Sequence, residues 1–557
     1  MSELGYIPCD ADIADAVNRY FPFVNPNPGQ KESIFVAVKS IFQGYAHVII
    51  EAPTGVGKSV IATTIHNVMS SFNPAWRSTI TTATRNLQQQ YQRTPKADIM
   101  DLMGKTNYKC PIGVGPYNSA ECRRTVAQRK CRPKNECPYL IRRNMWTTQA
   151  RLRSTNNSFM IEACTELVCT PDTRSDLTML DECHKLEDAL LEHTTVKIDE
   201  RDLHQVSGLY GDLNILELCR AYVKSLEKFE VGVVVRVEGE FRSSLIELSS
   251  AVSEAHYRLK SAVERAKAEG VEAAPIIYDT ISELQDIEDK AKLFTDTESS
   301  CVILQERDPA GFGVTIKPVF AADVSEFGIF RKGDFHVHLS ATICGIEEYA
   351  RALGIAEGDY KAIQISNPIP VENRPIHVVP VVKMTGTIDD SKLKLLVETI
   401  DKVIDSHLNE NGIVHTVSYK LAESIKAMSR HSRRMLVSGK VREIMDALNS
   451  KEPRIVLSPA IEEGVDLKGD LSRFQVIAKV PYGYLGDPLV KLRSERYPLS
   501  YARSAVLRIV QACGRSVRGV DDYAQTYILD SSFETLLTRN SELFPEWFKE
   551  ALHFHEV

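Results

Sequence analysis

A glycine-rich turn between an apolar strand and a helix constrains the fold more than any other segment. Val48-Ile49-Ile50 predicts a buried strand, Ala52-Pro-Thr-Gly-Val-Gly-Lys-Ser59 follows it, and residues 60–69 are compatible with a helix. A strand, a P-loop and a helix in this order are typical of a parallel α/β sheet. Ala52 stands where the motif usually has its first glycine, and a Gly/Ser-rich connector before an ordinary helix is the alternative.

The turn predicts a site for nucleotide phosphates. Backbone N–H groups of Gly55, Val56 and Gly57 are expected to face the phosphates, and Thr54 of the same turn is expected to bind the nucleotide as well. Lys58 adds a positive charge at the β- and γ-phosphates, and the Ser59 hydroxyl is placed to bind Mg²⁺.

Two carboxylates end a second apolar strand. Asp181 and Glu182 directly follow residues 177–180, and such a pair is costly at a strand end unless a positive charge lies opposite. Mg²⁺ supplies that charge. We expect Asp181 to hold the metal and Glu182 to orient and deprotonate the water that attacks the γ-phosphate. A helix N-cap at Asp181, with Glu182 in the first turn, is the structural alternative.

An Arg-x-x-Arg pair lies far downstream. The sequence predicts a helix that begins near Ala502 and ends by Gly519, which places Arg515 and Arg518 on one face. Two arginines on one face can reach across a cleft to a γ-phosphate, as an arginine finger supplied in cis does. Solvated surface arginines are the alternative, but the preceding Gln511 and the upstream P-loop favour a catalytic pair.

Six segments in a fixed order resemble the motif series of superfamily 2 helicases. Besides the P-loop and the arginine segment, they are Thr82-Ala-Thr-Arg85, Asp181-Glu-Cys-His184, Leu339-Ser-Ala-Thr342 and Glu463-Gly-Val-Asp466. The Asp-Glu-Cys-His form is similar to the XPD/DinG group of DNA helicases, and the resemblance spans nearly the whole chain. It implies ATP hydrolysis coupled to 5′ to 3′ movement on single-stranded DNA and unwinding of forked or tailed duplex DNA.

The resemblance also implies roles for single residues. Gln30 is similar to the adenine-reading glutamine of the family, and Gly464, Asp466 and Gln511 are expected to bind the ATP from the second lobe. The expected catalytic residues come from both lobes: Lys58, Glu182, Arg515 and Arg518. We expect DNA backbone contacts from one pair of residues in each lobe: Thr84, Arg85, Ser418 and Tyr419.

A cluster of cysteines indicates a metal site. Four of the twelve cysteines fall in one short window: Cys110, Cys122, Cys131 and Cys137. The chain shows no secretory signal or transmembrane run, so we expect a reducing compartment, in which clustered thiols indicate metal. The spacing lacks the Cys-x-x-Cys pairs typical of zinc and leaves both zinc and an iron–sulfur cluster open. The context is similar to the cluster domain of XPD and DinG, which implies that these four thiolates hold a [4Fe–4S] cluster.

The cysteine segment is also basic. Residues 109–153 carry eleven Lys or Arg and two acidic residues in a chain of net charge −7, which predicts a surface that follows DNA phosphates. Four aromatic residues lie in or beside this segment: Tyr108, Tyr117, Tyr139 and Trp146. As a group they are expected to stack unpaired bases, while each taken alone is first expected to pack a small module.

A second insert is acidic. Residues 199–308 hold twenty-three acidic and thirteen basic residues, and their apolar positions recur at helical spacing. A helical insert at this place is similar to the arch of the family. Its acidity predicts that most of its outer face is solvated and does not wrap DNA closely.

We expect an α/β fold of two RecA-like P-loop lobes with a four-cysteine iron–sulfur insert and a helical arch insert. Strand-like runs alternate with helical stretches on both sides of the inserts, and Pro368, Pro370 and Pro375 mark a linker between the lobes. The expected order is lobe 1 in 1–105, the iron–sulfur domain in 106–150, lobe 1 again in 151–197, the arch in 198–312, the end of lobe 1 in 313–366, and lobe 2 in 367–557.

Three other functions share part of this pattern. A superfamily 2 RNA helicase has the motor motifs but no reason for the cysteine insert. A translocase that strips proteins from single strands has the same sequence features, and a nucleotide-gated clamp need not keep Glu182 or both arginines. We expect a monomer that works on DNA in the cytoplasm, from a microbial or viral source, without a membrane partner.

Overall fold

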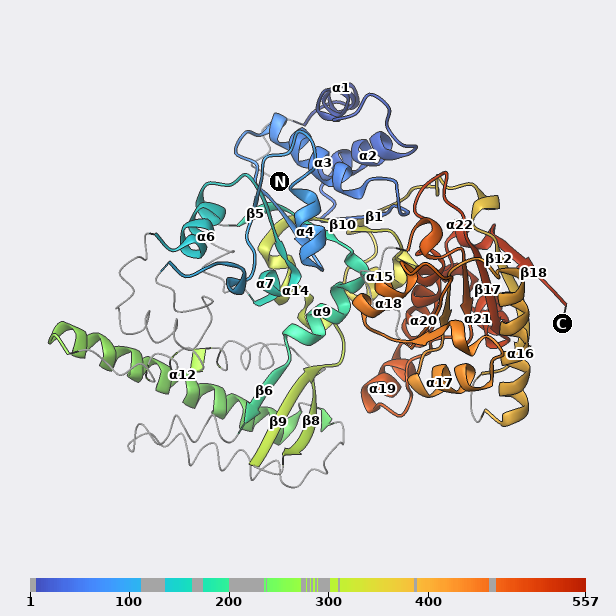
Figure 1. Ribbon diagram of the computed structural model, residues 1–557. Coiled ribbons are helices and arrows are strands. Elements are labelled where there is room, and N and C mark those ends of the chain that lie inside the picture. Colours follow the sequence, from blue (N-terminus) through green and yellow to red (C-terminus); the bar gives the residue numbers. More distant parts are fainter. Residues whose placement is uncertain are drawn as a thin grey trace.

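The chain forms two α/β lobes and a smaller antiparallel unit, which lies below the first lobe in Figure 1. The computed structural model describes residues 7–111, 136–162, 174–199, 235–236, 238–271, 277, 281, 284–285, 288, 301–308, 311–384, 388–459 and 467–556.

The first lobe contains a seven-stranded parallel sheet. Its order is β11-β1-β10-β5-β2-β4-β3, so the P-loop strand β1 has neighbours on both sides. The strands are β1 (His47–Glu51), β2 (Ser78–Thr82), β3 (Ile99–Asp101), β4 (Leu152–Asn156), β5 (Ser175–Asp181), β10 (Gly333–Ser340) and β11 (Tyr360–Gln364). The apolar runs at 48–50 and 177–180 predicted β1 and β5. All five residues of β1 are buried, because helices cover both faces of the sheet.

Alternate side chains of β1 enter two separate cores. Val48 and Ile50 pack with the helices of one face, and Ile49 packs with those of the other. The first face is covered by α1 (Asp10–Tyr20), α2 (Gln30–Phe42) and α3 (Lys58–Phe72). The second is covered by α6 (Pro138–Thr148), α7 (Asn157–Glu162), α9 (Leu186–His193), α14 (Ala322–Gly328) and α15 (Ile346–Ala352).

The segment between α9 and α14 combines a long helix with a sheet. The sheet is antiparallel with the order β6-β9-β8-β7: β6 (Val196–Asp199), β7 (Val235–Arg236), β8 (Cys301–Asp308) and β9 (Gly311–Pro318). The helix α12 spans Gly239–Ala268. We expected helices alone here. Strand β8 contains the apolar run Val302-Ile303-Leu304, whose β-branched residues favour a strand, and β9 continues past residue 312, where the arch was expected to end.

The second lobe contains another seven-stranded parallel sheet, with the order β14-β15-β13-β16-β17-β12-β18. The strands are β12 (Ile376–Val382), β13 (Gly412–His415), β14 (Met435–Val437), β15 (Ile455–Ser458), β16 (Phe474–Ile477), β17 (Gln525–Asp530) and β18 (Leu552–Phe554). The expected proline-containing linker joins β11 of the first lobe to β12 of the second.

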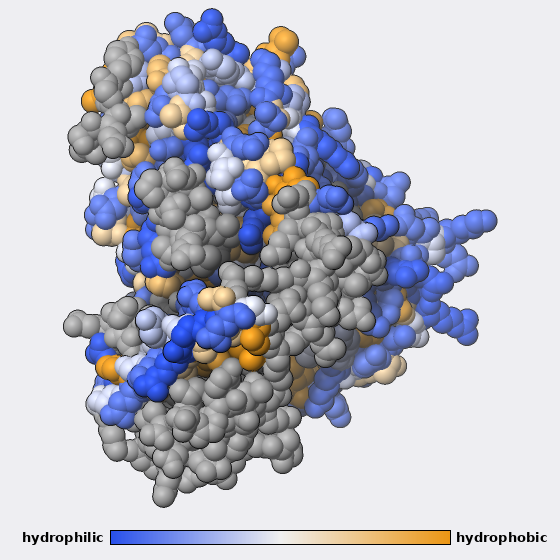
Figure 2. Space-filling model, turned by 90° about the vertical axis from the view of Figure 1, so that its left-hand side faces the viewer, coloured by the Kyte–Doolittle hydropathy of each residue, from blue (hydrophilic) through white to orange (hydrophobic). Residues whose placement is uncertain are grey.

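Helices also cover both faces of the second sheet. Ile528 packs with the helices of one face, and the next residue, Leu529, packs with those of the other. The helices are α16 (Asp390–Ser406), α17 (Tyr419–Met428), α18 (Val441–Leu448), α19 (Pro488–Arg496), α20 (Pro498–Cys513), α21 (Ser532–Arg539) and α22 (Glu546–Lys549). On the face of the molecule in Figure 2, described apolar side chains form only small separate patches, because most apolar residues lie in these cores.

The lobes contact each other through α20. Arg503 of this helix is buried and donates from Nε to the carbonyl oxygen of Ile343, 3.1 Å away. Its Nη1 lies 3.5 Å from Oε2 of Glu187 in α9. Ile343 directly follows the Ser-Ala-Thr segment, and Glu187 lies just after the Asp-Glu-Cys-His segment. The second lobe therefore touches the first directly behind two of its motif segments.

Candidate active site

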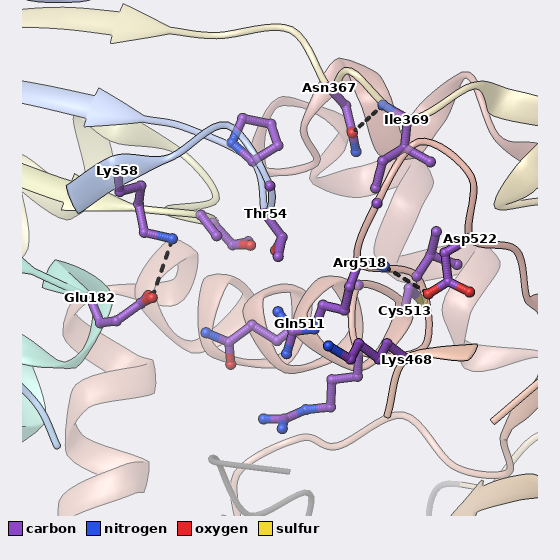
Figure 3. A pocket seen from close by; sticks show the side chains of 18 of the residues that line it. Thr54, Lys58, Glu182, Asn367, Ile369, Lys468, Gln511, Cys513, Arg518 and Asp522 are labelled. Atoms are coloured by element: carbon purple, nitrogen blue, oxygen red, sulfur yellow. Dashed lines mark hydrogen bonds and ion pairs between the residues drawn. The ribbon is translucent and has the colours of Figure 1, made fainter. Parts of the chain in front are cut away.

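A cavity of about 1630 Å³ lies between the two lobes and is lined by residues of both. From the first lobe it contains most of the predicted nucleotide-binding residues: Thr54, Gly55, Gly57, Lys58, Ser59, Asp181 and Glu182. From the second lobe it contains Gln511, Arg515 and Arg518. Figure 3 shows Lys58 and Glu182 on one side of this space, with Gln511 and Arg518 across from them. Gly464 and Asp466 lie outside the described residues.

Two glycines of the P-loop have left-handed backbone angles. Gly55 has φ +89° and Gly57 has φ +91°, which an L side chain rarely adopts. A Cβ atom on Gly57 would also lie 2.7 Å from Nε2 of Gln30. Helix α3 begins directly after this turn at Lys58, so its free N–H groups and its dipole favour an anion at the turn.

The acidic pair sits at the end of β5 beside the P-loop lysine. Nζ of Lys58 lies 3.3 Å from Oε1 of Glu182. Glu182 has a left-handed backbone with φ 51° and ψ 49°, unusual for a residue with a side chain, and its N–H donates to Oδ1 of Asp181 at 3.0 Å. A left-handed conformation at such a residue costs about 1 kcal/mol. At Glu182 this conformation directs the side chain toward the cavity.

The protonation of the pair follows from its neighbours. Burial and the nearby charge of Glu182 raise the pKa of Asp181 to about 7. Burial also acts to raise the pKa of Glu182, but the charges of Lys58 and His184 outweigh it and lower that pKa. Burial acts to lower the pKa of Lys58, but the two carboxylates outweigh it and raise that pKa.

The donor set around Asp181 fits a divalent cation. Asp181 is only 3% exposed and lies beside a second carboxylate, whose charge Lys58 partly balances. The hydroxyl-bearing Ser59 lines the same cavity. Mg²⁺ prefers oxygen ligands of this kind, and its charge would favour the ionised form of Asp181.

The Asp-Glu-Cys-His and Ser-Ala-Thr segments meet beside Glu182. Nδ1 of His184 lies 2.8 Å from Oγ of Ser340 and 3.4 Å from Oε2 of Glu182. Oγ of Ser340 also accepts a hydrogen bond from the N–H of Thr342 at 3.2 Å. The sequence identified both segments but did not predict this contact, because residues 156 positions apart are brought together only by the pairing of β5 with β10.

The two arginines do not lie on a helix. Helix α20 begins earlier than predicted, at Pro498, and ends at Cys513, with Gly514 as its C-cap residue. Arg515 and Arg518 therefore belong to the loop that follows, which corrects the prediction of a helix reaching Gly519. A loop brings both residues to the cavity and places the carbonyl oxygen of Arg518 next to the P-loop at Gly55.

Gln30 contacts the P-loop rather than the cavity. It is buried, its Nε2 donates to the carbonyl oxygen of Val56 at 2.5 Å, and its Oε1 accepts from the N–H of Asn27 at 2.7 Å. In this conformation both ends of its amide bind protein backbone. The adenine-reading role stays a prediction, and the role visible in the structure is to brace the phosphate turn.

The predicted DNA contacts occupy equivalent positions in the two lobes. Thr84 is the N-cap of α4 (Arg85–Tyr91), where its side chain accepts from Leu87 N–H, and Ser418 caps α17 by accepting from Leu421 N–H. Each cap lies two residues after a threonine, Thr82 or Thr416, whose Oγ1 donates to the carbonyl oxygen of the cap residue. Thr84 lines the cavity, and Arg85, Ser418 and Tyr419 are exposed.

The aromatic group beside the cysteines is mostly structural. Tyr139 and Trp146 of α6 are buried in the core of the first lobe, and Nε1 of Trp146 donates to the carbonyl oxygen of Ser154. Arg153, counted above in the basic segment, is buried as well and lies over the Trp146 ring. The base-stacking prediction is therefore wrong for these two aromatics, because α6 packs into the lobe, and Tyr117 lies outside the described residues.

Two of the four clustered cysteines can be placed. Cys110 is partly exposed and Cys137 is buried at the N-cap of α6, while Cys122 and Cys131 lie outside the described residues. Among the described residues, no group of three or more His, Cys, Asp or Glu side chains is arranged to hold a metal ion. The cluster assignment stays a prediction.

Other residues of the site escaped the sequence analysis. Oδ1 of Asp522 accepts from Nη1 of Arg473 at 3.0 Å, and Oδ2 accepts from the N–H of Arg518 at 3.2 Å. Arg473 and the nearby Lys468 line the cavity. The only available signal was the position of Asp522, four residues after Arg518.

Comparison with known proteins agrees with the motifs. Residues 400–551 match the Helicase C-terminal domain family. Over 216 residues the chain is 23% identical to the ATP-dependent DNA helicase DinG of Photobacterium profundum. This match covers 34% of the chain and 31% of that protein, so the chain matches about a third of its relative's length.

Solved structures extend the likeness to the whole fold. The similarity covers 96% of this chain and 100% of a solved XPD helicase, with a TM-score of 0.58 and 14% identity. It covers 95% of this chain and 99% of Xpd4 of S. tokodaii, with a TM-score of 0.56 and 14% identity. The chain is similar to the XPD/DinG group of helicases. Like the solved XPD structures, it has two parallel-sheet α/β lobes, and the cavity lies between them. Among its described helices, none is both long and apolar enough to cross a membrane.

Proposed function

We propose that this chain is an ATP-dependent DNA helicase that moves 5′ to 3′ on single-stranded DNA and separates forked or tailed duplex DNA. The observation that carries the proposal is the cavity between the lobes, which is lined by Lys58 and Glu182 of the first lobe and by Arg515 and Arg518 of the second. Nucleotide bound there contacts both lobes, so its hydrolysis can change how they sit relative to each other.

The chain's own groups suit phosphoryl transfer to water. The P-loop turn and Lys58 bind and orient the phosphates, while Arg515 and Arg518 approach from the other lobe and stabilise charge on the γ-phosphate. Glu182, held ionised by Lys58, accepts the proton of the attacking water. Asp181 and Ser59 would hold Mg²⁺, which supplies positive charge at the phosphates.

The two helix N-caps support movement along a strand. Thr84 and Ser418 occupy equivalent positions in separate lobes, each with a hydroxyl at the start of a helix. Hydroxyl and backbone N–H groups at such places bind phosphate oxygens without reading bases. If each lobe binds the strand there, opening and closing the cavity would shift one binding point relative to the other.

We also propose that Cys110, Cys122, Cys131 and Cys137 bind a [4Fe–4S] cluster. The two described ends of the segment support this. Tyr108 and Tyr139, each two residues from a cysteine, pack edge to face with their ring centroids 5.5 Å apart. The two described ends of the segment therefore lie side by side. Anaerobically purified protein should be yellow-brown with about four irons per chain, and Cys131→Ser should bleach it. Colourless protein that contains zinc would contradict the cluster.

ATP hydrolysis measured with different nucleic acids tests the function. Single-stranded DNA should stimulate hydrolysis strongly, and blunt duplex DNA or RNA should do so weakly. The stimulation should fall steeply with salt because phosphate contacts release counterions. A 5′-tailed duplex should be unwound and a 3′-tailed one should not. Equal stimulation by RNA would support an RNA helicase. Displacement of streptavidin without unwinding would support a protein-stripping translocase.

A further inference from the structure

Lys468 extends into the cavity from the second lobe. It directly precedes a short 3₁₀ turn, Gly469–Leu471, and lines the same cavity as the P-loop. Figure 3 shows its side chain pointing toward the space beside Gln511 and Arg518, opposite Lys58. It belongs neither to the P-loop nor to the Arg-x-x-Arg segment, so none of the roles assigned so far includes it.

Among the described residues, Lys468 has no ion-pair partner, unlike three other cations that line the cavity. Lys58 is paired with Glu182, and Arg473 is paired with Asp522. Arg374, which also lines the cavity, contacts Glu550. Within the described part of the chain, no acidic group lies within ion-pair distance of Lys468. A cation that points into a cavity beside an arginine, with no anion of its own, is suited to an anionic ligand.

Asp522 fixes the backbone on both sides of this cation. Its two carboxylate oxygens accept the N–H of Gly469 at 3.2 and 3.3 Å, and Oδ2 accepts the N–H of Arg518 at 3.2 Å. Arg473 supplies the positive charge that balances Asp522. One carboxylate therefore ties the residue after Lys468 to the backbone of Arg518, so both cations are held at the same side of the cavity.

We propose that Lys468 binds the terminal phosphate of the nucleotide beside Arg518, and that Asp522 is the positioning residue that holds this pair together. The inference rests on the proposed function, because it takes the cavity to be the ATP site. It adds a phosphate contact from the second lobe. A nucleotide that lacks the γ-phosphate would leave that contact unmade, so Lys468 makes closure of the lobes depend on ATP rather than ADP.

Binding of AMP-PNP and ADP in the presence of Mg²⁺ tests the lysine. Lys468→Ala should weaken AMP-PNP binding roughly tenfold or more, since a hydrogen bond to a charged group is lost, and should change ADP binding little. Lys468→Arg should restore most of the affinity. Lys451→Ala, which removes an exposed lysine of the same lobe outside the cavity, is the matched control and should bind like wild type.

A double-mutant cycle tests the positioning role of Asp522. Asp522→Asn should weaken AMP-PNP binding, and adding Lys468→Ala to it should cost much less than in the wild-type background, because the lysine is no longer held in place. Additive losses would show that Asp522 acts on folding alone. Unchanged AMP-PNP binding in Lys468→Ala would overturn the inference. A loss confined to single-stranded DNA binding would instead make Lys468 a DNA contact.

Lys58→Ala separates this inference from the proposed function. If Lys58→Ala loses nucleotide binding while Lys468→Ala keeps it, the ATP site stands and only the role of Lys468 fails. If Lys58→Ala binds AMP-PNP like wild type, the cavity is not the nucleotide site and both proposals fail.

Discussion

At the scale of single residues, Glu182 combines an unusual backbone with a controlled charge. Its left-handed conformation turns the side chain toward Lys58 and His184, whose charges lower its pKa despite burial. Asp181, one residue earlier, has the opposite shift, to a pKa of about 7. Neighbouring carboxylates with different pKa values are suited to different roles. Glu182 is suited to accept a proton from water, and Asp181 is suited to bind a metal ion, whose charge would favour its ionised form.

Glu182→Gln should separate nucleotide binding from turnover. The amide keeps the size of the side chain but cannot accept the proton of water, so hydrolysis should fall by a factor of about 10²–10⁴ while ATP stays bound. Lys58→Ala, in contrast, should weaken binding itself. Steady-state hydrolysis and equilibrium nucleotide binding measure the two effects. Hydrolysis by Glu182→Gln within tenfold of wild type would remove Glu182 from the role of base.

The sequence was informative about residues whose role depends on local spacing. The sequence placed Lys58 after a predicted strand and turn and Glu182 at the end of a second strand, and both residues line the cavity. Lys468 and Asp522 were missed, since the contact that links their segments joins residues 53 positions apart, Gly469 and Asp522. Trp146 is buried, as expected for each aromatic taken alone, so it does not support the base-stacking prediction made for the group.

At the scale of elements, strands β1 and β10 carry a buried chain of histidines. Nδ1 of His47 lies 3.1 Å from Nε2 of His338, and Nδ1 of His338 lies 2.9 Å from the Tyr349 hydroxyl. Burial lowers the pKa of His47 to about 4, with only partial opposition from Asp359. Burial and the charge of His47 also lower the pKa of His338. The strand pair therefore requires neutral imidazoles.

The free energy of unfolding should fall as the pH drops from 7.5 to 5. Unfolded His47, with an ordinary pKa near ~6.5, takes up a proton in this range before the folded residue does, so acid favours the unfolded chain. For His47 alone the loss is roughly 2 kcal/mol. Urea denaturation at both pH values measures it. His47→Gln should reduce the pH dependence. An unreduced dependence in His47→Gln would contradict this account.

Helix ends and short strands were the elements that the sequence predicted least well. Helix α20 was predicted to include Arg518, but it ends at Cys513 before a glycine that the sequence does contain. Strands β3 and β14 have three residues each, too few for an alternating pattern to be recognised. The long buried strands were predicted well because a strand covered on both faces needs a continuous apolar run.

At the scale of the whole molecule, Arg503 links the lobes. It contacts Ile343 and Glu187, which lie just behind the Ser-Ala-Thr and Asp-Glu-Cys-His segments, from a helix that leads to Gln511 and the two arginines. Movement of the second lobe relative to the first therefore has to change the surroundings of this guanidinium. The contact is suited to couple nucleotide chemistry to the position of the lobes.

Arg503→Met should uncouple the lobes. The variant keeps apolar length but loses the hydrogen bond to Ile343 and leaves Glu187 without its partner, at a stability cost of about 1–3 kcal/mol. Nucleotide binding should persist, while stimulation of hydrolysis by single-stranded DNA should fall several-fold. Arg508→Met changes an exposed arginine of the same helix and should keep full stimulation. Full stimulation in Arg503→Met would show that the contact only supports the fold.

The order of strands in the first sheet also determines when this lobe can fold during synthesis. Strand β1 lies between β10 and β11, so His47 pairs with His336, 289 residues further along. At about 5–20 residues per second a ribosome needs on the order of 15–60 s to make that stretch, and until then the apolar P-loop strand has neither sheet neighbour. Every strand of the second sheet, in contrast, lies between Ile376 and Phe554. The early half of the nascent chain is thus the part most exposed to aggregation and most dependent on chaperones, although it is made first.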